Sequence, residues 1–190
     1  MKEKKKLIRL VLCALFAALT VVMTFTPYLG YITVGIIEIT TLHIVVILGA
    51  TILGPKYGAI LGGVWGLTCV MRAFQFGIIP FQNPLVSLVP RIIVGLVAGL
   101  VFYALLKTKC KKPISLALSA FAGTLTNTVL VLSALKIFGG FETLFGEAAK
   151  TLEVIIATLI STNGLIELIS AVVVVSAIYL ATEKFFKNKI

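Results

Sequence analysis

The stretch NPLVSLVPRIIVGLVAGLVFYALL, residues 83–106, determines the fold class of this chain. A helix over these residues would cross the roughly 30 Å hydrocarbon core of a bilayer, since each residue adds about 1.5 Å. The stretch carries a single charge, Arg91, directly after Pro90. Arg91 would lie about 10 Å below the outer end of the helix. An ionisable side chain at that depth is costly, so Arg91 is a candidate functional residue.

The composition of the whole chain agrees with a membrane location. Of its 190 residues, 59% are hydrophobic and 13% are charged, whereas soluble domains are about 45–50% apolar and 25% charged. We expect a single membrane domain over residues 1–190, with about six spans and no soluble domain. The net charge of +10 is assigned to loops at the membrane surface, so no nucleic-acid partner is expected.

The hydrophobic pattern and its breakers predict an all-α integral membrane protein with six transmembrane helices. The expected spans cover about residues 7–25, 42–53, 57–74, 85–106, 114–138 and 152–179. The first is expected to be a retained span, because no cleavage site of the signal-peptide type follows it. Residues 28–41, YLGYITVGIIEITT, predict an extended or re-entrant segment. Part of it is expected to help fill the bilayer, because the second and third spans are short.

Basic residues indicate the orientation of the chain. Most of the 17 lysines and arginines lie in the termini and in connections on the same side, whereas Arg72, Arg91, Lys136 and Lys150 lie nearer the other side. The positive-inside rule therefore predicts both termini in the cytoplasm. Most acidic and amide side chains gather in the outer loops or within the spans, so a ligand is expected to arrive from outside.

Signals for catalysis and metal binding are weak. The three cysteines form no CxxC pair and the chain has one histidine, so neither a zinc site nor cysteine–histidine catalysis is expected. The chain has no aspartate, which leaves little acid–base chemistry for a membrane-embedded enzyme. We therefore expect no enzymatic activity, no catalytic residues and no cofactor.

Two interpretations of Arg91 remain open from the residues alone. The guanidinium could extend outward to the membrane interface, as long basic side chains often do. Alternatively, Pro90 interrupts the span, and the guanidinium beside a half-helix N-terminus forms an anion site suited to a carboxylate or phosphate.

Other polar residues are expected within the spans or in the outer loops. Asn127 lies near the middle of the fifth span, while Asn163 and Glu167 share one face of the sixth. Either asparagine could bond a neighbouring helix or a ligand. Glu167 could pair with an arginine, relay protons or contact a ligand. The remaining candidates could line the same cavity or serve packing and interfaces: Glu38, His43, Trp65, Arg72 and Asn83.

Small residues recur at four-residue spacing on three of the expected spans, which allows helices to approach closely. These sets are Ala14 and Ala18, Gly62, Gly63 and Gly66, and Gly95 and Gly99. The first set lies in the cytoplasmic half of its span, where a partner protein could dock.

The chain resembles the substrate-binding S components of energy-coupling factor (ECF) vitamin transporters. The resemblance covers nearly all residues and rests on the Ala14/Ala18 face and three segments. These are HIVVILGATILGPKYGAILGGVWGL at 43–67, SLVPRIIVGLVAG at 87–99 and NGLIEL at 163–168. It implies that one vitamin binds from outside, between the outer halves of the last three spans and the loop after the first. It also implies partners: a membrane T component, docking on the Ala14/Ala18 face, and two ABC-type ATPases.

Within this family, the Val-Pro-Arg stretch is most similar to pantothenate S components. The resemblance then implies that Arg91 pairs with the pantothenate carboxylate, while Asn127 and Asn163 bond its hydroxyl and amide groups. Riboflavin, pyridoxine and a pyrimidine precursor remain alternative ligands. A secondary transporter that acts alone and a structural membrane subunit are the rival classes.

Overall fold

The computed structural model describes residues 2–34, 37–138, 143 and 164–187. Its elements are α1 (Lys2–Phe25), β1 (Tyr31–Val34), β2 (Ile37–Thr40), α2 (Leu42–Leu53), α3 (Pro55–Phe76), α4 (Ile79–Gln82), α5 (Pro84–Lys107), α6 (Lys112–Ile137) and α9 (Leu165–Lys187). Within these residues, five helices are long and apolar enough to cross a membrane: α1, α3, α5, α6 and α9. The helical membrane fold is therefore confirmed. The short helix α2 stands where the second of the six predicted spans was expected.

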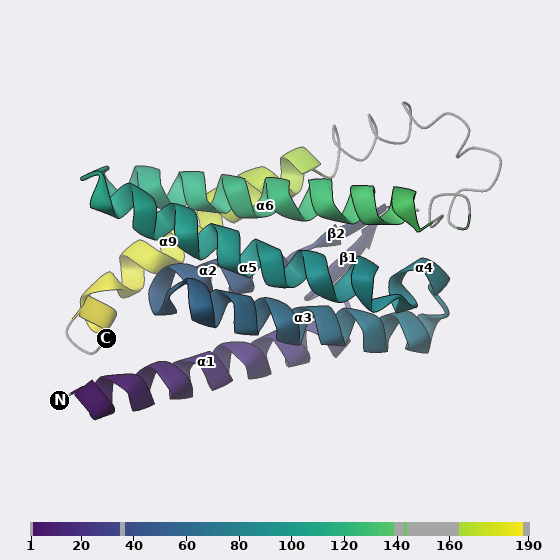
Figure 1. The fold of residues 1–190 in the computed structure, drawn as a ribbon, viewed down its shortest axis with the longest axis horizontal. Coiled ribbons are helices and arrows are strands. Elements are labelled where there is room, and N and C mark those ends of the chain that lie inside the picture. Colours follow the sequence, from purple (N-terminus) through teal and green to yellow (C-terminus); the bar gives the residue numbers. More distant parts are fainter. Residues whose placement is uncertain (1, 35–36, 139–142, 144–163, 188–190) are drawn as a thin grey trace.

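The helices form an elongated bundle with different segments at its two ends (Figure 1). Helix α1 begins and α9 ends at one end of the bundle, where the α5–α6 turn also lies. Helix α4 lies at the opposite end. The side of the bilayer that each end faces stays a prediction from the basic residues.

The segment between α1 and α2 forms a hairpin of two antiparallel strands, β1 and β2. Tyr31 pairs with Thr40 and Thr33 with Glu38. The backbone N–H of Thr41 donates to the Gly30 carbonyl at 3.0 Å, just outside the paired strands. The extended segment predicted for residues 28–41 is thus confirmed, as an addition to the otherwise helical fold.

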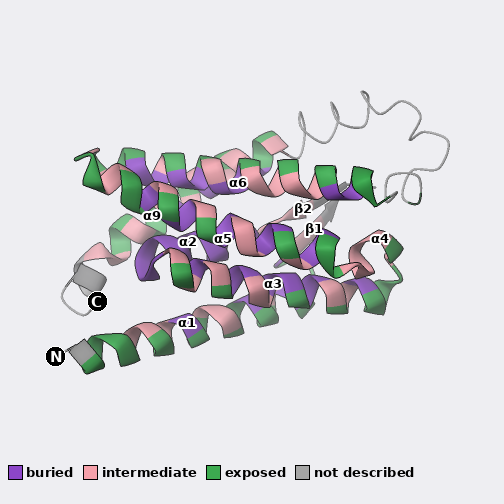
Figure 2. Cartoon of the chain, viewed as in Figure 1, coloured by how far each residue is buried: buried purple, intermediate pink, exposed green. Residues whose placement is uncertain are grey.

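Helix α2 is buried along its whole length (Figure 2). It packs against α1, α3, α5, α6 and α9, which explains why it is apolar on every side. Gly54, with a φ of 109°, separates α2 from α3, and Pro55 starts α3. The expectation that the third span is short is wrong, because α3 continues to Phe76 and ends at Gly77 in the left-handed conformation.

Helices α3 and α5 pack closely because α3 presents glycines to α5. A Cβ at Gly62 would overlap the carbonyl of Arg91, and one at Gly66 would crowd the neighbouring turn of α5. A Cβ at Gly63 would meet only the Ile92 side chain, at 3.7 Å. The predicted small-residue face is therefore confirmed at Gly62 and Gly66, whereas Gly63 lies beside it.

Candidate functional site

Arg91 lies inside α5, which continues through Pro90 as one helix. Of the two interpretations of Arg91, the one in which Pro90 interrupts the span and leaves a half-helix N-terminus is therefore wrong. Proline lacks the N–H that would bond the carbonyl four residues earlier, which is that of Val86. Arg91 Nη1 donates to this carbonyl oxygen at 2.8 Å. The side chain thus supplies the donor that the proline removes, so the Val86 carbonyl has a hydrogen-bond partner.

The guanidinium of Arg91 is enclosed by aromatic rings. Arg91 is 7% exposed, so its side chain ends inside the bundle. The guanidinium carbon lies 5.3 Å from the ring centre of Trp65 and 5.8 Å from that of Phe81, within range of a cation–π attraction. Among the described residues, no carboxylate lies within ion-pair distance of it. A buried cation without an ion-pair partner favours an anionic ligand.

Several buried polar atoms of α2, α3, α5 and α6 lack a hydrogen-bond partner among the described residues. They are His43 Nδ1 and Nε2, Trp65 Nε1, Arg91 Nε, Thr124 Oγ1 and Asn127 Oδ1. Buried polar groups are normally bonded, because an unpaired one costs about 1–3 kcal/mol. These residues, which we call the polar cluster, come from α2, α3, α5 and α6. His43 also faces the backbone of Thr40 and Glu167, and Trp65 faces the Tyr31 hydroxyl. The open groups of Arg91, Thr124 and Asn127 are therefore the better candidates for contact with a ligand.

The packing of α5 on α6 places two members of the polar cluster at one depth. Ser119 Oγ donates to the Ala98 carbonyl at 2.7 Å. Asn127 lies about two turns beyond Ser119, and Arg91 lies about two turns before Ala98. Because the two helices run in opposite directions (Figure 1), both displacements lead toward the same end of the bundle. Arg91 and Asn127 therefore lie at similar depth.

Glu167 anchors the hairpin beside the polar cluster. Its Oε1 accepts the backbone N–H of Thr40 at 2.6 Å, and the residue is buried. It interacts electrostatically with Arg91 but forms no ion pair with it. His43, which is fully buried, lies next to the backbone of Thr40 and Glu167. Glu167 therefore has a structural partner other than the arginine that the sequence suggested.

Arg72 and Asn83 have partners of their own. The guanidinium carbon of Arg72 lies 3.9 Å from the ring centre of Tyr31. Asn83 Oδ1 accepts the N–H of Leu85 at 2.9 Å, which caps α5. These contacts indicate support for the hairpin and for the start of α5.

Two predicted site positions cannot be placed, and two residues near the site were not predicted from the sequence. Asn163 and the side chain of Glu38 lie outside the described residues. Tyr31, whose hydroxyl lies 3.0 Å from Cys69 Sγ, was not singled out. Neither was Thr124 as a site residue, because threonine hydroxyls in helices usually bond their own backbone. Nothing in the sequence marks Thr124 as a threonine whose hydroxyl lacks such a backbone bond.

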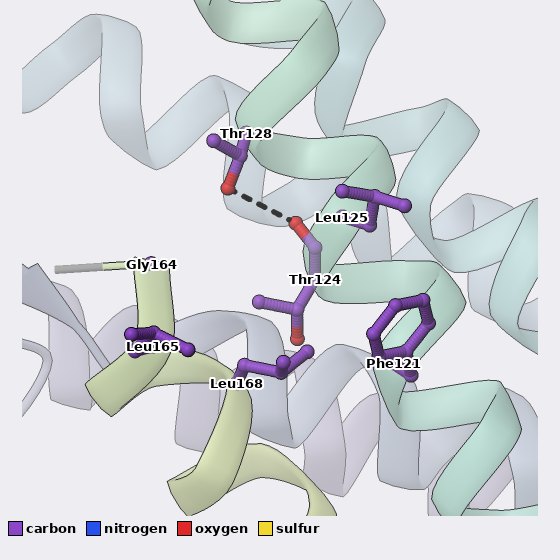
Figure 3. Close-up of a pocket in the computed structure, with 7 residues that line it drawn as sticks. All are labelled: Phe121, Thr124, Leu125, Thr128, Gly164, Leu165 and Leu168. Atoms are coloured by element: carbon purple, nitrogen blue, oxygen red, sulfur yellow. Dashed lines mark hydrogen bonds between the residues drawn. The ribbon is translucent and has the colours of Figure 1, made fainter. Parts of the chain in front are cut away.

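A pocket of about 220 Å³ lies between α6 and the start of α9 (Figure 3). Its lining residues are Phe121, Thr124, Leu125, Thr128, Gly164, Leu165 and Leu168. Thr128 Oγ1 donates to the Thr124 carbonyl at 3.2 Å, so its hydroxyl is satisfied. Thr124 lies about one turn from Asn127 and connects the pocket to the polar cluster. The mainly apolar walls suit an uncharged part of a ligand.

Comparison with known proteins defines the class. The family model of the substrate-specific component of ECF transporters matches residues 8–179. The chain therefore belongs to the family of ECF transporter substrate-specific components.

Two relatives are similar over most of their length. The pantothenic acid transporter PanT of Lactococcus lactis subsp. cremoris is 34% identical over 206 residues, covering 99% of this chain and 100% of the relative. The pantothenate transporter PanT of Leuconostoc mesenteroides subsp. mesenteroides is 33% identical over 181 residues, covering 89% of each chain.

Proposed function

We propose that this chain captures pantothenate from the outer side of the membrane for import by an ECF transporter. The observation that carries the proposal is the buried Arg91, which forms no ion pair with a carboxylate among the described residues and lies in the polar cluster. Pantothenate offers one carboxylate for the guanidinium and hydroxyl and amide groups for neutral partners. The names of the two relatives support the same ligand.

Each part of the ligand has a proposed partner. Arg91 binds the carboxylate through charge-assisted hydrogen bonds. Asn127 bonds the hydroxyl or amide groups, together with Asn163. His43 and Trp65 are proposed to form part of the wall of the ligand site, with the Trp65 ring beside the Arg91 guanidinium.

The remaining predicted residues have supporting roles in this proposal. Glu167 holds the hairpin through Thr40, and Arg72 packs on Tyr31. Asn83 caps the helix that carries the arginine. Glu38, in β2, is proposed to contribute to the same ligand site.

Import requires a source of energy, for which we propose the ECF partners: a membrane T component and two ABC-type ATPases. The proposed docking face on α1 is marked by Ala14 and Ala18, both of which are exposed. Small side chains there let a partner helix approach closely. In this proposal both termini lie in the cytoplasm.

Calorimetric titration of the purified protein in detergent tests the ligand. We expect one pantothenate per chain, and at least about a hundredfold weaker binding of its alcohol analogue, because a buried guanidinium left without its anion is costly. Equal binding of both compounds would overturn the role of Arg91. Binding of riboflavin with no binding of pantothenate would overturn the ligand, and uptake into vesicles by the chain alone would overturn the dependence on ECF partners.

A further inference from the structure

The guanidinium of Arg91 is held by its own helix. Its Nη1 donates to the Val86 carbonyl five residues earlier, at 2.8 Å. Helical arginines usually direct their side chains toward the N-terminus of the helix, which brings this one within reach of the carbonyl. The Val86 residue is 1% exposed, so water does not supply an alternative donor.

This bond exists because Pro90 stands four residues after Val86. Any other residue at position 90 would present a backbone N–H to the same carbonyl, as in a regular helix. That N–H would compete with Arg91 Nη1 and release the guanidinium. Pro90 therefore acts on Arg91 through the Val86 carbonyl.

We propose that Pro90 is a positioning residue that holds Arg91 ready for the ligand carboxylate. This inference rests on the proposed function. The bond to Val86 occupies one donor of the guanidinium and leaves the buried Nε unpaired. The Trp65 and Phe81 rings restrict the group further. The Arg91 side chain is thus already ordered in the folded protein. Ligand binding therefore does not have to offset the entropy cost of ordering it.

The test is Pro90→Ala, which restores the backbone donor with a good helix former. We expect pantothenate affinity to fall about tenfold, the size of one ordinary hydrogen bond. Affinity for the alcohol analogue should remain unchanged, because that ligand has no carboxylate. Pro113→Ala is the matched control, since Pro113 is exposed in the first turn of α6, where no backbone bond is displaced. An unchanged pantothenate affinity, or an equal loss for both ligands, would overturn the inference.

A double-mutant cycle separates positioning from general damage to the helix. In the Arg91→Ala background, Pro90→Ala should cause no further loss of pantothenate affinity, because the residue it positions is absent. Additive losses would contradict the inference. If Pro90→Ala does not fold, Pro90→Ser supplies the same backbone donor for the same cycle.

The chain has one tryptophan, Trp65, which provides a readout besides affinity. Release of the guanidinium beside its ring should change the fluorescence emission of ligand-free Pro90→Ala, but not that of Pro113→Ala. Identical emission from Pro90→Ala and the unmodified protein would count against the inference. Unchanged pantothenate affinity in Arg91→Ala alone would overturn the proposed function itself. A large loss of pantothenate affinity in Arg91→Ala, with no effect of Pro90→Ala, would overturn only the positioning role of Pro90.

Discussion

The backbone N–H of Thr40 donates to Oε1 of Glu167 at 2.6 Å, joining β2 to α9 across 127 positions of the chain. The last residue of the hairpin is thereby fixed to a helix that also lies near Arg91. Thr40 is close to the start of α2, so the same bond helps to place His43. This buried carboxylate therefore fixes the hairpin against α9 through a backbone N–H.

Removal of this anchor should destabilise the fold. We expect Glu167→Ala to lower the free energy of unfolding by about 1–3 kcal/mol, because the Thr40 N–H is left without its acceptor. Glu183→Ala is the matched control on the same helix. Its ion pair with Lys112 is partly exposed, so its loss should cost less than about 1 kcal/mol. Thermal unfolding in detergent compares the two variants, and equal effects would contradict the anchoring role.

Arg91 should be sensitive even to a conservative change. Arg91→Ala is expected to weaken pantothenate binding at least about a hundredfold, while the protein stays folded. Arg91→Lys keeps the charge but cannot reproduce the planar fork of donors. It should therefore also lose at least about tenfold in affinity. Full affinity of the lysine variant in calorimetry would show that charge alone is recognised.

Neighbouring polar residues on α6 should differ in their effect on binding. Asn127→Leu removes an unpaired buried oxygen, and we expect it to weaken pantothenate binding about tenfold or more, which corresponds to about one hydrogen bond. Thr126→Val is the control, because Thr126 Oγ1 already donates to the Ala122 carbonyl at 2.7 Å. The pantothenate affinity of Thr126→Val should stay within about twofold of that of the unmodified protein, because substitutions away from specific interactions usually have small effects. A similar loss in both variants would indicate a general disturbance of α6.

Two adjacent glycines on α3 should respond in opposite ways to alanine. Gly62→Ala places a Cβ against the Arg91 carbonyl, and overpacking of this kind costs about 1–3 kcal/mol or more. Gly63→Ala meets only a side chain at 3.7 Å and should be neutral or slightly stabilising, since alanine favours helix. Thermal unfolding checks the stabilities. Tolerance of both substitutions would contradict the close α3–α5 contact.

The proposed docking face on α1 should affect assembly and leave ligand binding intact. We expect Ala14→Leu combined with Ala18→Leu to abolish co-purification with a T component, because the added side chains prevent close helix approach. Leu19→Phe, at an exposed position away from this face, is the control and should assemble normally. Pantothenate titration should give the same affinity for both variants. Assembly of the leucine variant would refute the docking face.

Much of the fold follows from hydrophobic pattern and breakers. The long apolar runs predicted the helices because a bilayer offers no partner for an open backbone group. The polar alternation of residues 28–41 predicted the extended segment that became β1 and β2. Pattern alone left open whether the helix breaks at Pro90, because the answer depends on whether another donor can reach the Val86 carbonyl. The Arg91 side chain provides that donor.

The sequence by itself determined the membrane class, most span positions and the depths of Arg91 and Asn127 along their helices, because these follow from local composition and helix rise. Only the tertiary structure decided which polar groups remain open. Glu167, Arg72 and Asn83 have partners, whereas Arg91, Thr124 and Asn127 retain unpaired atoms among the described residues. The physical reason is that a hydrogen bond depends on the distance between two groups in space. Spacing along one helix does not specify what the neighbouring helix presents to it.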